Sequence, residues 1–114
     1  MTFERYSVVR VPFPFTERSA TKNRPALVLS MAGAFNTVAG HSVMAMITSS
    51  GSAPWPLDCP LRDHAAAGLS APSTVRFKLF TLDHRLVRGE LGRLAQVDEQ
   101  TVHHALANLL GMRA

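Results

Sequence analysis

Apolar and polar residues alternate with a period of two over much of this chain, which is the pattern of half-buried β-strands. In residues 6–15 (YSVVRVPFPF), the odd positions from Val9 onward are apolar, and Arg10, Pro12 and Pro14 share the other face. Because proline cannot donate a hydrogen bond to a sheet, these prolines indicate an edge strand or a strand end. Four further strands are expected, at residues 24–30, 41–50, 74–81 and 90–97.

The C-terminal segment has helical spacing instead, with apolar residues at 102, 105, 106, 109 and 110 and Gly111 as a stop. Asp98 is expected to cap this helix, with Val97 and Val102 forming a hydrophobic staple around the cap. A short helical turn is expected at residues 32–36. Several short strands and one terminal helix predict a mainly β fold, a small barrel-like sheet with a helix packed against it. The 114 residues suit one domain, 1–114.

Composition narrows the function classes. No apolar run approaches the roughly 20 residues that cross a bilayer, and the N-terminus lacks the basic-then-apolar layout of a secretory signal. Cys59 is the single cysteine, so an intrachain disulfide is impossible and a cytoplasmic location is expected. The net charge of +4 and pI near 10.2 suit a phosphate-bearing partner, although they equally suit a protein whose charge serves solubility.

A first candidate site is the polar loop of residues 16–23, which runs into Arg24 between two apolar strands. Arginine binds phosphate well because its planar fork donates two parallel hydrogen bonds. A solvated hairpin loop explains the segment equally simply. Arg24 differs, since at the start of an apolar strand it is expected to be partly desolvated, either for a role in binding or in a structural ion pair.

Two other candidates lie on strands. Thr48, Ser49 and Ser50 end the strand at 41–50, in which Val43, Ala45 and Ile47 share one face and Met44, Met46 and Thr48 the other. Their hydroxyl groups can bind a phosphate oxygen or merely pair with turn backbone. Arg76 and Lys78 are two residues apart and therefore form a basic stripe on one strand face, which suits a nucleic-acid backbone or simply solvent.

Other chemistries lack their motifs. The five histidines and one cysteine have no recognised metal-ligand spacing. A Gly-rich phosphate loop and a G-x-S-x-G nucleophile elbow are also missing. Trp55, between two prolines, can stack on a base, but a packing role is the simpler interpretation.

Two blocks near the N-terminus resemble the opening strands of the MazF/PemK toxin family. Residues 8–16 (VVRVPFPFT) and 22–30 (KNRPALVLS) match that family's F-P-F-T strand end and its K-x-R-P-A-L-V-L-S strand. Looser matches follow in family order over most of the chain: Ala34-Phe35-Asn36, Ile47-Thr48-Ser49, Gly68-Leu69, Ser73-Thr74-Val75-Arg76, Thr81-Leu82-Asp83 and Gly92-Arg93-Leu94.

The resemblance implies an SH3-like β-barrel of the MazF/PemK/CcdB type, usually a homodimer, that cleaves single-stranded RNA and is inhibited by a cognate antitoxin. It implies no metal and no cofactor, because the RNA's own 2′-OH attacks the phosphorus. By matching position, Arg24 and Thr48 would be catalytic. RNA-binding residues would be Thr16, Arg18, Lys22, Asn23, Ser49, Arg76 and Lys78.

Two departures from the family pattern concern the first strand and the site. Members often begin that strand with Gly-Asp, where this chain has Tyr6-Ser7. Some PemK-type members carry Arg-x-Asp on a later strand, and Lys78 stands at the Asp position, so a carboxylate base is missing there.

Three other functions remain. One is a catalytically silent member that binds RNA or antitoxin. Another is a CcdB-like gyrase poison, but those proteins carry a tryptophan near the C-terminus, where this chain ends GMRA. The third, an SH3-like peptide-binding domain, would need an aromatic-lined groove, and the chain has one Trp and one Tyr.

Overall fold

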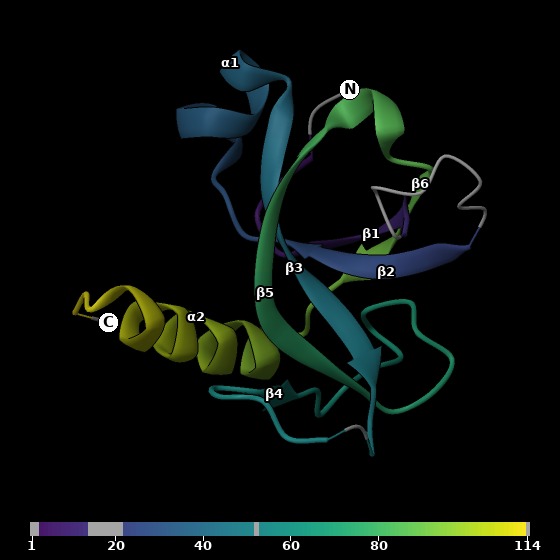
Figure 1. Ribbon diagram of the computed structural model, residues 1–114, viewed down its shortest axis with the longest axis vertical. Helices are drawn as coiled ribbons and strands as arrows, with labels where there is room; N and C mark the ends of the chain where they lie inside the picture. The colour runs from purple at the N-terminus through teal and green to yellow at the C-terminus, as the bar shows by residue number, and fades with distance from the viewer. Residues whose placement is uncertain (1–2, 14–21, 52, 114) are drawn as a thin grey trace.

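One antiparallel sheet organises the protein (Figure 1). The computed structural model describes residues 3–13, 22–51 and 53–113. Six strands form the sheet in the order β4-β5-β3-β2-β1-β6, and every neighbouring pair is antiparallel. Their bounds are β1 Ser7–Pro12, β2 Asn23–Val28, β3 His41–Ser49, β4 Cys59–Pro60, β5 Ser73–Asp83 and β6 Gly89–Arg93. The predicted mainly β fold with a C-terminal helix is confirmed.

Period-two alternation produces two hydrophobic cores, one on each face of the curled sheet. The first core includes Val8, Leu27, Ala45, Ile47, Val75 and Val102. The second includes Phe3, Val9, Val11, Ala26, Val28, Met44 and Leu82. Strand β1 is therefore buried on both faces, and it lies between β2 and β6. Pro12 ends the strand as expected, whereas the alternative that β1 is an edge strand is wrong.

The terminal helix α2, Gln96–Leu110, lies across one end of the sheet and buries Val102 in the first core (Figure 1). It ends at Gly111 with φ 69°, as predicted. Its start differs from the prediction, because Ala95 is the N-cap and Asp98 lies inside the first turn. The Asp98 carboxylate accepts backbone N–H groups of residues 62 and 63 instead, so the predicted cap and staple are wrong.

Short helical turns make the remaining connections. They are η1 Ala32–Asn36, which was expected, α1 Thr37–Ala39 and η2 His84–Leu86. Strand β6 ends at Arg93, earlier than expected, because residues 96 and 97 already belong to α2. Among the described residues, no helix is both long and apolar enough to span a membrane.

Strand β5 is curved (Figure 1) and contains a bulge opposite β3. Met46 pairs with Arg76, but its neighbour Ala45 pairs with Leu79, so Phe77 and Lys78 are extra residues. Bulged strands bend and twist locally. Because the bulge inserts two residues, side chains continue to alternate between the two faces of the strand. Arg76, Lys78 and Phe80 therefore have alternate positions that belong to the same face.

Candidate functional site

A cleft of about 410 Å³ opens on the second-core face of the sheet. Its lining comes from β2, β3, β5 and the end of β1: Phe13, Arg24, Met46, Ile47, Thr48, Arg76, Lys78, Leu79 and Phe80. Most of these residues continue the alternate positions that build the second core, such as Ala26 and Met44. The cleft is therefore the place where one core-facing row of side chains changes from apolar to charged.

Arg24 enters the cleft from the start of β2, opposite Val11 on β1. It shares a strand face with Ala26 and Val28, which are fully buried. Arg24 itself is exposed, so the predicted partial desolvation is wrong. Within the described part of the chain no carboxylate pairs with Arg24. Among the described residues, therefore, no ion pair competes with a ligand for its guanidinium.

Thr48 lies on the neighbouring part of β3, paired with Thr74 of β5 and half-buried. It follows Met46 on the same face and lines the cleft together with Arg24. The structure thus brings together the two residues that the family resemblance nominates as catalytic. They come from different strands and are separated by 24 positions in the chain.

Arg76 also lines the cleft, but most of its donors are engaged. Its Nε donates to Asp58 Oδ1 at 3.1 Å, and its Nη2 donates to Asp58 Oδ2 at 2.8 Å and to the Ala53 carbonyl at 2.7 Å. These hydrogen bonds lower the pKa of Asp58 and raise that of Arg76. Arg76 therefore holds a neighbouring loop in addition to lining the cleft.

Lys78 is exposed beside Arg76 and lines the cleft as well. Its Nζ lies 4.6 Å from the centroid of the Trp55 ring, within the range of a cation–π contact. The ammonium group thus stands between the cleft and an aromatic ring.

Of the other predicted RNA-binding residues, the three that the structure describes, Lys22, Asn23 and Ser49, do not line this cleft. The Asn23 side-chain oxygen accepts a hydrogen bond from Arg88 Nη1 at 2.8 Å, and the Lys22 carbonyl accepts the N–H of Phe13. Ser49 is exposed at the end of β3. Thr16 and Arg18 lie outside the described residues.

Several residues of this site were not predicted from the sequence. Met46 and Phe80 line the cleft. Each is two positions from a predicted site residue, Thr48 or Lys78, and this spacing on a strand indicates the same face. Asp58, which binds Arg76, carried no such signal, because its position depends on how the loop after β3 closes. For the metal question, no three His, Cys, Asp or Glu side chains among the described residues lie close enough to hold an ion.

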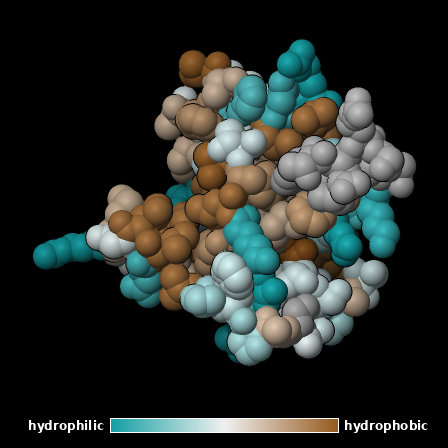
Figure 2. Space-filling model, viewed as in Figure 1, coloured by the Kyte–Doolittle hydropathy of each residue, from teal (hydrophilic) through white to brown (hydrophobic). Residues whose placement is uncertain are grey.

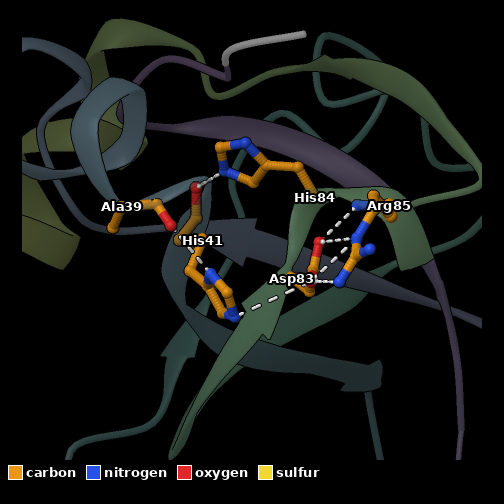
Figure 3. Close-up of polar contacts among 6 residues, drawn as sticks. Ala39, His41, Asp83, His84 and Arg85 are labelled. Atoms are coloured by element: carbon orange, nitrogen blue, oxygen red, sulfur yellow. Dashed lines mark hydrogen bonds and ion pairs between the residues drawn. The ribbon is translucent and has the colours of Figure 1, made fainter.

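A second hollow, about 480 Å³, lies at the other end of β5 (Figure 3). His41 Nδ1 lies 3.0 Å from the Ala39 carbonyl, while its Nε2 lies 3.9 Å from Asp83 Oδ2, which also receives a bond from Arg85. Ser42 Oγ lies 2.7 Å from His84 Nε2. Ser42 is fully buried and cannot reach a substrate, so this pair joins β3 to the turn after β5.

The buried thiol of Cys59 is equally unsuited to chemistry. It is 3% exposed, and burial raises its pKa to about 11. A thiol that stays protonated is a poor nucleophile. Of the described clusters, the cleft around Arg24 and Thr48 therefore has the features of a functional site.

Comparison with known proteins identifies the family of this fold and cleft. Residues 4–110 match the family described as PemK-like, MazF-like toxin of type II toxin-antitoxin system. The chain belongs to this family. A search among curated proteins finds no match.

Solved structures of MazF are similar over nearly the whole chain. MazF from Deinococcus radiodurans is 29% identical with a TM-score of 0.74, and the match covers 98% of this chain and 99% of that chain. The same organism's MazE–MazF complex (Form-III) gives 27% identity and a TM-score of 0.77, with 99% and 100% covered. An endoribonuclease in complex with its cognate antitoxin from a mycobacterial species, at 20% identity, shows a shared fold (TM-score 0.74; 99% and 97% covered).

One departure from the PemK/MazF pattern has a structural consequence. Tyr6, where members often have glycine, adopts φ 71°, a left-handed conformation that glycine tolerates best. The residue is 9% exposed, and the guanidinium carbon of Arg5 lies 4.8 Å from the centroid of its ring. Packing of the ring therefore holds a backbone conformation that the residue type disfavours.

Proposed function

We propose that this protein is a toxin endoribonuclease that cleaves single-stranded RNA without a metal ion. The observation that carries the proposal is the shared cleft of Arg24 and Thr48, in a chain of the PemK/MazF family. The net charge of +4 adds attraction for a polyanion. The cleft has an open side, as a single-stranded substrate requires.

In the proposed reaction the RNA supplies its own nucleophile. The 2′-oxygen forms a bond to the adjacent phosphorus as the bond to the 5′-oxygen breaks, which leaves a 2′,3′-cyclic phosphate and a 5′-OH. The 2′-OH proton passes to solvent water, and the leaving 5′-oxygen takes a proton from water, so the number of protons balances. No protein nucleophile is needed in this scheme.

Arg24 and Thr48 would stabilise the transition state of this reaction. Arg24 donates to the non-bridging phosphate oxygens, where negative charge grows, and Thr48 hydrogen-bonds the same phosphate. One preorganised donor of this kind is worth roughly a hundredfold to a thousandfold in rate. Lys78 replaces the Asp of some relatives, so the scheme uses cations and a hydroxyl group rather than a carboxylate base.

Two protein partners are part of the proposal. The Deinococcus MazF structures include complexes with MazE. We propose that this chain also binds a cognate antitoxin, and that the antitoxin covers the cleft. We also propose a homodimer. Figure 2 shows hydrophobic residues gathered over α2. Leu109 and Leu110 at the end of α2 are 40% and 56% exposed, and Met112, just after the helix, is 64% exposed. Such exposure favours a subunit contact.

The test is incubation of the purified protein with a long single-stranded RNA in excess EDTA, with the chemistry of the new ends mapped. Arg24→Ala is expected to cut at least about a hundredfold more slowly. Arg85→Ala removes the same charge from an arginine outside the cleft and should cut normally. Near-normal cutting by Arg24→Ala would refute its assignment. Intact RNA with the wild-type protein would instead favour a silent RNA- or antitoxin-binding member.

A further inference from the structure

The loop after β3 contains a strained turn beside the cleft. The Trp55 carbonyl accepts the N–H of Asp58 at 3.2 Å, Pro56 is second in the turn, and Leu57, third, has φ 64°. This arrangement fits a type II turn, which normally places glycine third. A leucine in this conformation is strained, and it persists only where surrounding contacts hold it. Such strain is typical of functional sites.

Asp58 and Arg76 supply the contacts that hold the turn. Asp58 Oδ2 accepts the Trp55 N–H at 3.1 Å as well as Arg76 Nη2 at 2.8 Å. Arg76 also reaches the Ala53 carbonyl, before the turn. The side chains of Arg76 and Asp58 are only 14% and 20% exposed, so solvent screens this pair less than a surface pair. The turn is thereby fixed to β5.

The fixed turn presents Trp55 rather than burying it. Trp55 is 42% exposed and belongs to neither hydrophobic core, which argues against a packing anchor. Lys78, which lines the cleft, places its ammonium group over the ring. An aromatic ring that is held rigidly and exposed loses little entropy when a ligand stacks on it.

We propose that Trp55 is a base-stacking contact for the RNA, held at the rim of the cleft by the Arg76–Asp58 pair and by Lys78. This inference rests on the proposed function, because the stacked base would belong to a nucleotide next to the phosphate that Arg24 and Thr48 bind. Stacking on an aromatic ring together with a cation that follows the backbone is the usual mode of single-strand binding. A purine stacks more strongly than a pyrimidine, so stacking on Trp55 would favour a purine at this position.

The protein's single tryptophan makes the contact directly observable. The full chain is titrated with short random-sequence RNA in which 2′-fluoro groups replace the attacking hydroxyls, so that binding is measured without cleavage. Anisotropy of labelled RNA reports binding, and intrinsic fluorescence with unlabelled RNA reports Trp55. Fluorescence quenching should follow the same binding curve as anisotropy.

Substitutions of Trp55 and Asp58 distinguish a stacking role of Trp55 from a purely structural one. Trp55→Leu should bind about tenfold more weakly or worse, whereas Trp55→Phe, which keeps an aromatic face, should stay within a few-fold of wild type. In cleavage assays, Trp55→Leu should raise KM with kcat almost unchanged, because the ring does not touch the reacting phosphorus. Asp58→Asn should leave folding intact but reduce quenching per bound RNA, since the ring is no longer positioned.

The outcomes distinguish this inference from the proposed function. An anisotropy change without quenching, or equal affinity of Trp55→Leu and wild type, would overturn the stacking contact and leave the endoribonuclease intact. No anisotropy change would overturn both. Quenching together with a selective loss in Trp55→Leu supports the contact.

Discussion

The carboxylate of Asp98 accepts the backbone N–H of Arg62 at 2.8 Å, although 36 positions separate the two residues. The other oxygen accepts the N–H of Asp63 at 3.0 Å. Asp98 is 1% exposed, so these two bonds replace its lost hydration. They tie the first turn of α2 to the segment that follows β4.

Replacing Asp98 by asparagine should therefore destabilise the fold. The amide keeps one acceptor oxygen but sets an NH₂ group against a backbone N–H, so that this N–H loses its acceptor and the buried NH₂ group faces a donor instead of an acceptor. A loss of about 2–3 kcal/mol in the free energy of unfolding is expected, measured by urea denaturation. Glu99→Gln changes the same charge in the same helical turn and should shift stability by no more than about 0.5 kcal/mol. Equal stability of both variants would contradict this role.

Asp98 also illustrates which parts of the structure could be predicted from the sequence. Strands follow from local alternation, and Gly111 from local helix-ending geometry, so both were predictable. Asp98 looked like a cap because caps are local too, and its real partners were invisible until the chain folded. The bulge at Phe77 and Lys78 was missed for the same reason, since alternation continues through it.

The site divides in the same way. Arg24 and Thr48 were predicted through family resemblance, and both line the cleft. The alternation of strand faces would have been enough to predict Met46 and Phe80 as further lining residues. The engagement of Arg76 with Asp58 depends on closure of a loop between residues 18 positions apart, which no periodic pattern encodes. A basic stripe predicted from the sequence therefore shows where the charged side chains lie, but not which of them are already engaged in ion pairs within the protein.

Asn36 is expected to be a second stability centre. It is fully buried, its Nδ2 donates to the carbonyls of Phe3 at 2.7 Å and Ser30 at 2.9 Å, and its Oδ1 accepts from the Ser30 hydroxyl. Asn36→Asp removes both donors and faces two carbonyls with an oxygen. It should lose about 2–4 kcal/mol of stability, seen as a lower thermal midpoint. Thr37→Ser, at the exposed neighbouring residue, serves as control; an unchanged midpoint for Asn36→Asp would disprove the network's importance.

Gly92 allows β6 to lie directly against the 62–69 segment. A Cβ at this position would meet the Ala66 carbonyl oxygen at 2.7 Å and the Ala67 carbonyl carbon at 2.7 Å. Gly92→Ala should therefore cost about 1–3 kcal/mol by overpacking. Gly33→Ala is the matched control, because a Cβ there meets nothing within 4 Å. Comparable denaturation midpoints for the two variants would show that the backbones separate easily.

Acid should release the turn that carries Trp55. Hydrogen bonds from Arg76 lower the pKa of Asp58 below its ordinary 3.8, so the folded turn binds the proton less tightly than the unfolded chain does. Its stabilisation is complete above that pH and is lost as pH falls toward the lowered folded pKa. Trp55 emission should shift to the red below about pH 3.8, as solvent reaches the ring. Asp58→Asn should show the shifted emission already at neutral pH; an identical titration in that variant would assign the change to other groups.

The strain at Leu57 can be measured by comparing two substitutions that remove the same side chain. At ordinary positions glycine is about 0.5–1 kcal/mol less stable than alanine, because it loses more backbone entropy. At φ 64° the order should reverse, since alanine suffers the left-handed penalty of roughly 1–2 kcal/mol and glycine does not. Leu57→Gly should therefore be more stable than Leu57→Ala in urea, while Ala53→Gly, at a residue without positive φ, should lose stability. If Leu57→Ala is the more stable of the pair, the turn relaxes without strain, and the Arg76–Asp58 pair alone holds Trp55 in place.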